Sequence, residues 1–381
     1  MTRTLAFLAA TTLAACGSAA DRDYAARGDH AVGYTVLAGD DLTVKAWYPT
    51  DADGVEDIDY MAQVRLFGPD SPEMPFFGAA IADAAPAPGS YPLVVLSHGF
   101  GMSPEWYHPL AEHLASRGFV VLGPEHVEYD WATDVLHATV SRPLEVSATL
   151  DLAETGVLDG IIDTDAVAVI GHSYGGTTAL AAGGARIHTG WLADACQGEL
   201  DPFTDAFFCQ PFLGQEDVLA AEMGLDAVPD GLWPSLADDR VDAIVAMAPD
   251  AGMFGDVGLA EVTVPAMLLG GTGDTAAPWA WGGGLAWDHV SSETRALVTF
   301  EGADHFIVTT TCDSMPWTAG LPEEFSALFC SDPAWDKPTA LALTNQLTAA
   351  FLADTLQGER RGRRHLERFE AVEGLRVETS R

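Results

Sequence analysis

A serine stands among glycines in the segment GHSYGG, residues 171–176, directly after the apolar run at 166–170. The pattern G-x-S-x-G between a buried strand and a helix is typical of a nucleophile elbow, a turn whose serine takes strained backbone angles. Only small residues fit beside such a serine, which explains Gly171 and Gly175. The pattern predicts that Ser173 attacks an acyl carbonyl. The alternative is a glycine-rich turn without chemistry.

A serine hydroxyl needs a base to take its proton, and one of the eleven histidines fits that role well. His305, in the segment GADHF, follows the last apolar run, which ends at Phe300. The chain order serine, acid, histidine places the base there. His172 flanks the serine but should point elsewhere, because neighbours in an elbow diverge. His98 and His126 lie on earlier loops, where we expect that they can line a pocket.

Two aspartates compete for the acid that orients the histidine. Asp274, in GTGDTAAP, follows the apolar run that ends at Leu269, and Asp250, in APDAG, follows the run before it. We favour Asp274, because that strand end is the commoner position for the acid in this kind of fold. Asp250 is the alternative acid, and would otherwise be a pocket residue.

The oxyanion of an acyl-transfer reaction needs two preorganised backbone N–H donors. The sequence predicts one from Tyr174, just after the nucleophile, and one from Phe100 in the glycine-rich loop SHGFG. For the substrate pocket we expect His98, Trp279 and Trp281. The tryptophans can equally be packing residues, since large apolar side chains are common in such folds. No metal or organic cofactor is needed for this chemistry.

The elements that must position these residues form an alternating pattern of buried strands and helices. This alternation predicts an α/β fold with a doubly wound, mostly parallel sheet. We expect one domain over residues 31–357, with a lid or cap insertion at 185–240, which is too long for a simple connection. Continuous apolar runs, typical of strands buried on both faces, predict the strands at 92–97, 119–122, 166–170, 243–247, 266–269 and 296–300.

Five motifs in order resemble the α/β-hydrolase superfamily: SHGFG, GFVVLGPEH, IIDTDAVAVIGHSYGG, GTGDTAAP and GADHF. Within it, the chain resembles bacterial predicted dienelactone hydrolases, close to platelet-activating-factor acetylhydrolases and cutinase-like polyester hydrolases. GTGDTAAP is similar to the acid loop of the polyester hydrolases and supports Asp274, whereas APDAGMF is similar to that of the acetylhydrolases and supports Asp250. Ser173 departs from the cysteine nucleophile of true dienelactone hydrolases, so the resemblance implies no lactone specificity.

The combined prediction is a serine hydrolase of carboxylic esters, an esterase or lipase-like enzyme whose substrate is a small-molecule, lipid or polyester ester. A peptidase or acyltransferase is the alternative among enzymes, because fold alone does not choose the reaction. A surface lipoprotein that uses the scaffold for binding only is the alternative from another class.

Charge and composition restrict the partners. The chain has 381 residues, a formal net charge of -38 and only two lysines, Lys45 and Lys337. Such an acidic surface argues against nucleic acid, whose phosphates it would repel. The acidity is that of a soluble acidic protein, or of one adapted to salt.

The N-terminus predicts export. Residues 1–15 have the shape of a signal peptide, and Leu13-Ala14-Ala15-Cys16 resembles a lipobox whose Cys16 is lipidated. This predicts a bacterial lipoprotein held to a membrane by its lipid anchor, in the periplasm, the outer membrane or at the cell surface, with residues 16–30 as a tether. An ordinary signal peptide cut nearby is the alternative.

The four other cysteines suggest two disulfides in an oxidising compartment. Three pairings are open, and we favour Cys196–Cys209 and Cys312–Cys330, because each brackets one local loop. Free buried thiols are the alternative, and the spacing does not suit a zinc site. The arginine-rich segment at 358–381 is expected to be a solvated, partly disordered tail, with contact to anionic lipids as the alternative.

Overall fold

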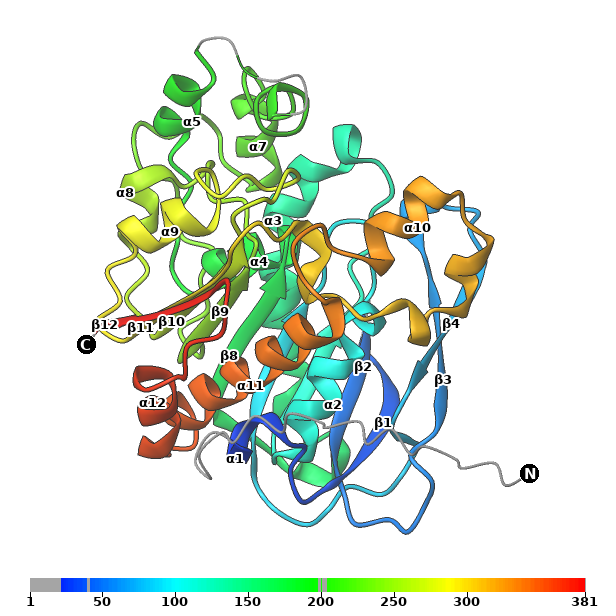
Figure 1. Ribbon diagram of the computed structural model, residues 1–381. Helices are drawn as coiled ribbons and strands as arrows, with labels where there is room; N and C mark the ends of the chain where they lie inside the picture. Colours follow the sequence, from blue (N-terminus) through cyan, green and yellow to red (C-terminus); the bar gives the residue numbers. More distant parts are fainter. Residues whose placement is uncertain (1–21, 40–41, 198–199, 201–203, 381) are drawn as a thin grey trace.

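A ten-stranded sheet forms the centre of the computed structural model (Figure 1), which describes residues 22–39, 42–197, 200 and 204–380. The strand order is β12-β11-β10-β9-β8-β6-β7-β2-β1-β5. The six strands from β7 to β11 in that order are parallel, whereas β12, β2 and β1 join antiparallel. This is the mostly parallel α/β architecture that the alternation of apolar runs predicts.

The strands of the structure, including a separate β3–β4 hairpin, have the following bounds. They are β1 Ala31–Ala38, β2 Thr43–Thr50, β3 Ile58–Gln63, β4 Glu73–Gly78, β5 Ile81–Ala82, β6 Tyr91–Ser97, β7 Val120–Pro124, β8 Ile162–His172, β9 Ala243–Met247, β10 Ala266–Gly271, β11 Arg295–Phe300 and β12 Leu375–Ser380.

The helices cover both faces of the sheet. They are α1 Arg22–Ala25, α2 His108–Ser116, α3 Trp131–Glu154, α4 Tyr174–Ala182, α5 Thr189–Ala195, α7 Glu216–Glu222, α8 Gly255–Leu259, α9 Gly283–His289, α10 Glu323–Cys330, α11 Lys337–Thr355 and α12 Arg360–Glu367. Helices α2 and α11 lie on one face, and α3 and α4 lie on the other (Figure 1). None of the helices in the described ranges is long and apolar enough to cross a membrane.

The central strands are buried on both faces, and their side chains alternate between two cores. In β9, Val245 and Met247 join the core under α2 and α11, whereas Ile244 and Ala246 join the core under α3 and α4. This alternation follows from the two-residue period of a strand, and burial on both faces explains why β9 is a continuous apolar run.

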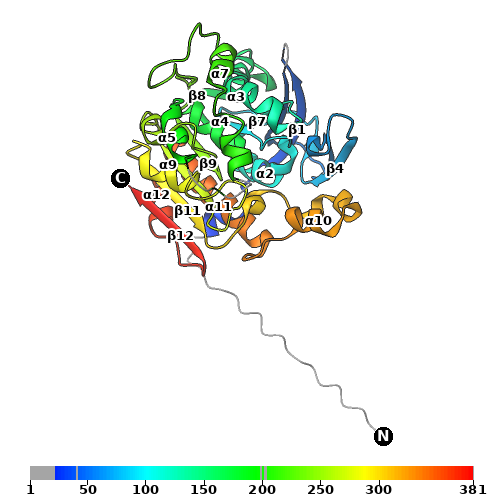
Figure 2. The same ribbon diagram turned by 90° about the horizontal axis from the view of Figure 1, so that it is seen from above.

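The insertion at 185–240 stands over one end of the sheet (Figure 1) and contains α5, a short π-helix at Asp205–Cys209 and α7. A disulfide joins Cys196 to Cys209 within it, and a second joins Cys312 to Cys330. Both pairings are the ones that the local spacing favours. The second disulfide ends at Cys330, the last residue of α10, and the segment that it closes contacts β4. Helix α10 and β4 lie on the side of the molecule away from β12 (Figure 2).

The C-terminal segment is not the solvated tail that its arginines suggest. Helix α12 packs on α11 through Gly362, His365 and Leu366, and its arginines face solvent. Strand β12 then pairs along the whole of β11 and closes one edge of the sheet. The prediction was wrong because three contact positions on one helical face suffice for docking, whatever the charge of the other face.

The predicted tether is also partly folded onto the domain. Tyr24 is buried in the core of α2 and α11, and its hydroxyl donates to Glu359 at 3.0 Å. The tether prediction therefore fails for residues 22–30. The signal peptide at 1–15 and the lipidation site Cys16 lie outside the described residues.

Candidate active site

Ser173 occupies a strained turn between β8 and α4. Its backbone angles are φ 56° and ψ -126°, a region that residues with a side chain rarely enter. The flanking glycines are required by close backbone contacts: a Cβ on Gly171 would lie 2.1 Å from the Gly175 carbonyl oxygen, and a Cβ on Gly175 would lie 2.0 Å from the Ser97 carbonyl oxygen. The turn thus has the geometry that the G-x-S-x-G pattern predicts.

His305 and Asp274 form a buried hydrogen-bonded pair. His305 begins a short turn after β11, and its Nδ1 lies 2.8 Å from Oδ2 of Asp274, which follows β10. The Asp274 side chain is 2% exposed and that of His305 is 6% exposed. The other carboxylate oxygen of Asp274 accepts from the backbone N–H groups of Ala276 and Ala277, at 2.9 and 2.7 Å. These bonds hold the carboxylate in one orientation toward the imidazole ring.

Ser173 and His305 line one cavity of about 280 Å³. Because Asp274 engages Nδ1, the ring nitrogen left for proton exchange with the serine is Nε2. The rest of the wall is mostly apolar and aromatic, and comes from loops after several strands together with the insertion: Leu66, Phe100, Gly101, Tyr129, Trp131, Tyr174, Phe207, Phe208, Asp250, Ala276, Ala277 and Phe306.

Phe100 and Tyr174 lie where the oxyanion donors are expected. Both residues line the cavity beside Ser173. Tyr174 is the first residue of α4, so its N–H has no partner within the helix. Among the described residues, no acceptor bonds the backbone N–H of either residue. Two unengaged donors therefore border the cavity next to the hydroxyl.

A buried ion pair supports these two donors from behind. Arg142, on α3, is fully buried and forms a bidentate pair with Glu128, at 2.5 and 2.6 Å. Its Nη1 donates to the His98 carbonyl at 2.7 Å, and its guanidinium lies over the rings of Phe100 and Tyr174, at 6.0 and 5.3 Å from their centroids. The pair thus fixes the glycine-rich loop against the start of α4.

A chain of hydrogen bonds joins the glycine-rich loop to the histidine loop. The Gly99 N–H donates to Tyr107 Oη at 3.1 Å, and Tyr107 Oη lies 2.8 Å from His172 Nδ1. His172 Nε2 lies 2.9 Å from the His305 carbonyl oxygen, which can only accept, so Nε2 carries the proton and Nδ1 accepts from the tyrosine. Burial holds the pKa of His172 well below its usual value, which keeps the ring neutral.

The structure places His98 away from the cavity. The side chain is fully buried; its Nδ1 bonds to the Gly99 carbonyl and its Nε2 accepts from the His126 N–H at 3.0 Å. Burial lowers the pKa of His98 well below its usual value. The expectation that it contacts substrate therefore fails, because both ring nitrogens already shape the loop.

Trp279 and Trp281 also lie outside the wall of the cavity. Trp281 packs edge-on against Trp191, with ring centroids 5.2 Å apart, and lies 5.6 Å from the ring of Phe208. Trp281 thus packs against the insertion, and Trp279 packs against the core under α3 and α4. The packing alternative holds for both.

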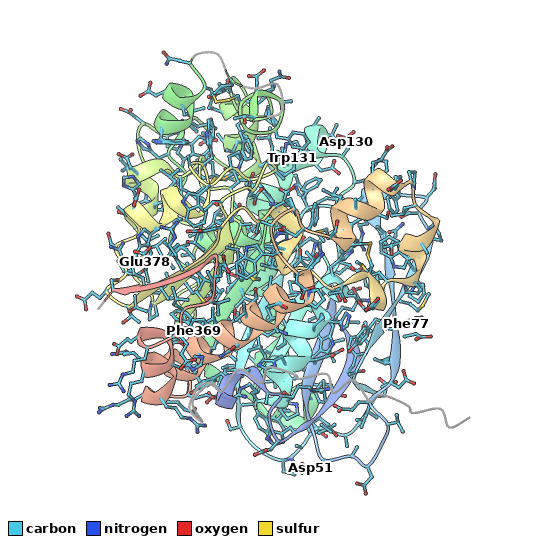
Figure 3. All side chains as sticks on the ribbon, in the orientation of Figure 1. Asp51, Phe77, Asp130, Trp131, Phe369 and Glu378 are labelled. Carbon is cyan, nitrogen blue, oxygen red and sulfur yellow. A yellow bond between two sulfur atoms is a disulfide. The ribbon has the colours of Figure 1, made fainter. Side chains whose placement is uncertain are left out.

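The aromatic wall comes instead from residues that the motifs do not include. Trp131 begins α3, directly after Asp130 (Figure 3). Asp130 caps the helix by accepting from the Ala132 N–H. The Trp131 indole N–H donates to the Phe207 carbonyl at 3.1 Å, which ties the insertion to the cavity rim. The position of Trp131 shortly after β7, at the same sheet edge as Ser173, is the signal that could have found it.

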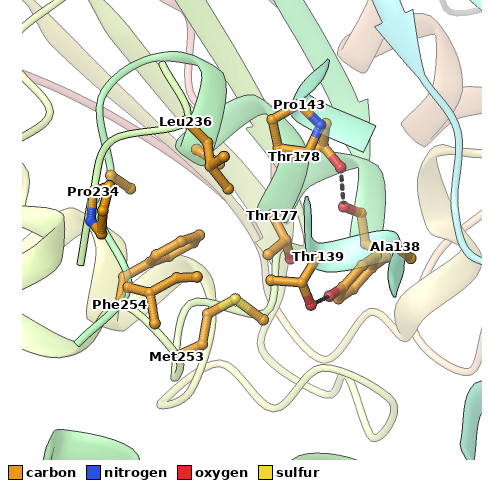
Figure 4. A pocket seen from close by; sticks show the side chains of 13 residues that line it. Ala138, Thr139, Pro143, Thr177, Thr178, Pro234, Leu236, Met253 and Phe254 are labelled. Carbon is orange, nitrogen blue, oxygen red and sulfur yellow. Dashed lines mark hydrogen bonds between the residues drawn. The ribbon is translucent and has the colours of Figure 1, made fainter. Parts of the chain in front are cut away.

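A second, narrower cavity lies on the other side of Tyr174, between α3, α4 and the insertion (Figure 4). Its volume is about 10 Å³, which is room for about one water molecule. The Tyr174 hydroxyl bonds to Thr139 at its wall, at 2.5 Å. This cavity is too small for an organic substrate, and the bond at its wall fixes the Tyr174 ring that bounds the larger one.

A model of the chlorophyllase family matches residues 74–191 of the chain. The matched region includes β6, the glycine-rich loop, the elbow and Ser173, and it ends before Asp274 and His305. The match suggests an ester hydrolase of the α/β-hydrolase type, in agreement with the mostly parallel sheet and its flanking helices.

Proposed function

We propose that the chain hydrolyses carboxylic esters through an acyl-enzyme, with Ser173 as nucleophile, His305 as base and Asp274 as the acid that orients it. The observation that carries the proposal is the buried Asp274–His305 bond at the wall of the cavity into which the strained Ser173 opens. The match to the chlorophyllase family supports the same class of reaction.

The first half of the reaction forms the acyl-enzyme. Ser173 Oγ attacks the carbonyl carbon while His305 Nε2 takes the hydroxyl proton. Asp274 stabilises the imidazolium through the Nδ1 bond. The carbonyl oxygen becomes an oxyanion that accepts from the N–H groups of Phe100 and Tyr174. The tetrahedral intermediate collapses when His305 gives its proton to the leaving alkoxide, and the alcohol departs.

The second half regenerates the serine. A water molecule takes the place of the alcohol and gives one proton to His305 as it attacks the acyl carbon. The second tetrahedral intermediate collapses with return of that proton to Ser173 Oγ, and the carboxylic acid leaves. No metal or cofactor enters either half.

The cavity favours esters with a short acyl chain or an aromatic group. Its volume of about 280 Å³ lies just below the range usual for drug-sized ligands. Its rings present flat apolar faces to a substrate, and the insertion supplies two of them, Phe207 and Phe208.

The test is turnover of p-nitrophenyl butyrate by the wild type, Ser173→Ala and His305→Ala, with Ser291→Ala as an exposed-serine control. We expect hydrolysis by the wild type and the control, and a loss of about 10⁴-fold or more in kcat in the other two. A fluorophosphonate should label the wild type at Ser173 only. Equal rates in the wild type and Ser173→Ala would exclude the proposed mechanism.

We further propose that the protein is exported and anchored by a lipid on Cys16. The proposal rests on the lipobox-like segment at 13–16, and two disulfides fit an oxidising compartment. Expression with labelled palmitate should give a labelled wild type and an unlabelled Cys16→Ala variant. Label that persists in Cys16→Ala would refute lipidation at this position.

A further inference from the structure

Asp250 is a carboxylate in the aromatic cavity that the proposed reaction does not use. It follows β9, the strand next to β10, and is 6% exposed. Its Oδ1 accepts from the Gly252 N–H at 3.0 Å, and its backbone bonds to Thr177. Its Oδ2 accepts no hydrogen bond from any described residue, although the side chain borders the cavity that holds Ser173.

No cation among the described residues compensates this carboxylate. The described residues that line the cavity include neither lysine nor arginine. The guanidinium of Arg142, which lies behind the rings of Phe100 and Tyr174, is already paired with Glu128, and His305 is paired with Asp274. Burial consequently raises the pKa of Asp250 to about 7, with only the Gly252 N–H acting against it.

Aromatic rings surround the same space. The Phe100 and Trp131 rings meet edge to face with centroids 4.9 Å apart, and Trp131 lies 5.2 Å from Tyr174 and 5.8 Å from Phe207. Tyr129, Phe208 and Phe306 complete the aromatic part of the wall. Aromatic faces attract a cation through their quadrupole, most strongly where water is excluded.

When Asp250 is ionised among these aromatic rings, a fully neutral ester leaves its charge uncompensated. The carboxylate is a good neighbour for an organic cation, which restores the charge balance and lies against the rings. The net charge of -38 also raises the local concentration of cations. The hydrogen bond from the Gly252 N–H gives Oδ1 of Asp250 a structural role in a local turn. Oδ2 has no such role among the described residues.

We propose that Asp250 and the aromatic rings of this cavity bind the ammonium group of a cationic ester substrate. The inference rests on the proposed ester hydrolysis and names the substrate class for the same site. Asp250 is then a specificity residue that contacts the substrate away from the reacting carbonyl, whereas Asp274 serves the histidine.

The test compares two esters of the same shape, butyrylcholine and its neutral carbon isostere 3,3-dimethylbutyl butyrate, at pH 8. The measured quantity is the ratio of their kcat/KM values in the wild type, in Asp250→Asn and in Asp256→Asn. Asp256 is an exposed carboxylate on α8, so the last variant controls for a change of net charge. Asparagine keeps the size of Asp250 and can still accept from the Gly252 N–H.

We expect the wild type and Asp256→Asn to prefer the cationic ester by about tenfold or more, and Asp250→Asn to bring the ratio close to one. A ratio near one in the wild type would overturn the proposal. Equal losses of both activities in Asp250→Asn would also overturn it, since the residue would then serve the chemistry.

Direct binding separates this inference from the proposed reaction. Phenyltrimethylammonium should bind the wild type and Ser173→Ala in calorimetry, and its affinity should fall about tenfold in Asp250→Asn. If the wild type hydrolyses no ester but binds this cation through Asp250, the reaction fails and the cation site stands. If it hydrolyses neutral esters but binds no cation, the proposed reaction stands and the cation site fails.

Discussion

Replacement of Asp274 by asparagine tests the arrangement of the active site most directly. Asparagine is nearly isosteric, but its amide group can donate a hydrogen bond to Nδ1 of His305. That bond would place the ring proton on Nε2, where it blocks uptake of the Ser173 proton. The variant should therefore fold normally and fail in the chemical step.

The size of the effect follows from the geometry. Asp274 Oδ2 lies 2.8 Å from His305 Nδ1, and both side chains are almost completely buried. At an effective dielectric constant of about 20, an ion pair at that separation is worth about 6 kcal/mol. At 1.36 kcal/mol per tenfold, this corresponds to a loss of roughly 10⁴-fold in kcat.

The assay is steady-state hydrolysis of p-nitrophenyl butyrate at pH 8, with thermal unfolding of each variant to show that it is folded. Asp250→Asn is the matched variant, because it also removes a buried carboxylate at the neighbouring strand end. We expect its kcat for this neutral ester to fall by no more than about tenfold. The assignment of Asp274 would be wrong if Asp274→Asn kept more than a tenth of kcat, or if Asp250→Asn lost as much.

Three further predictions concern the buried groups around the site. Tyr107→Phe leaves the Gly99 N–H and His172 Nδ1 without a partner, so we expect a loss of about 1–3 kcal/mol in the free energy of unfolding and a lower kcat at similar KM; stability within experimental error of the wild type would exclude the hydrogen-bond chain. Glu128→Gln breaks the ion pair with Arg142 and should lower the free energy of unfolding by about 3–5 kcal/mol, measured by urea titration with the disulfides intact. The double variant Glu128→Gln/Arg142→Met should recover most of that stability. If it recovers none, the broken ion pair is not the cause of the loss. Burial lowers the pKa of Lys337 to about 7, well below its value in the unfolded chain. The unfolded state therefore binds more protons between pH 7.5 and 9.5, and the free energy of unfolding should rise with pH by up to about 1.4 kcal/mol per unit. Lys337→Met should remove this slope, and an equal slope in the wild type and the variant would show that Lys337 is not its cause.

Local sequence patterns predict the helices and strands whose apolar residues recur with a regular spacing. The strands of the five parallel pairings each contain a run of apolar residues, because their central parts are covered on both faces. Ser173, Asp274 and His305 lie within five residues after the ends of β8, β10 and β11, and the carboxyl ends of parallel strands meet at one edge of a sheet. The approach of the three residues is thus contained in the order of the elements.

Contacts between loops leave no regular spacing of residues in the sequence, so the sequence does not predict them. Trp131 lies in a stretch without helical amphipathicity, so the beginning of α3 is marked only by its Asp130 cap. The bonds from Tyr107 to Gly99 and to His172 join positions up to 65 residues apart. Nothing in the sequence marks Arg142 as a buried residue, because its partner Glu128 lies outside α3. For these residues the fold must be known before the chemistry is visible.

The two candidate acids show why neighbouring strand ends with the same residue type need the structure to tell them apart. Asp274 receives hydrogen bonds from two backbone N–H groups and the imidazole of His305, which together hold its carboxyl group in one orientation. Asp250 receives one backbone N–H and is otherwise surrounded by apolar walls, so burial dominates and favours its neutral form unless a cation is present. Two carboxylates whose environments differ in this way are suited to different tasks. The backbone donors lie two positions after Asp250 and two and three positions after Asp274, and only the path of each loop determines which way those N–H groups point.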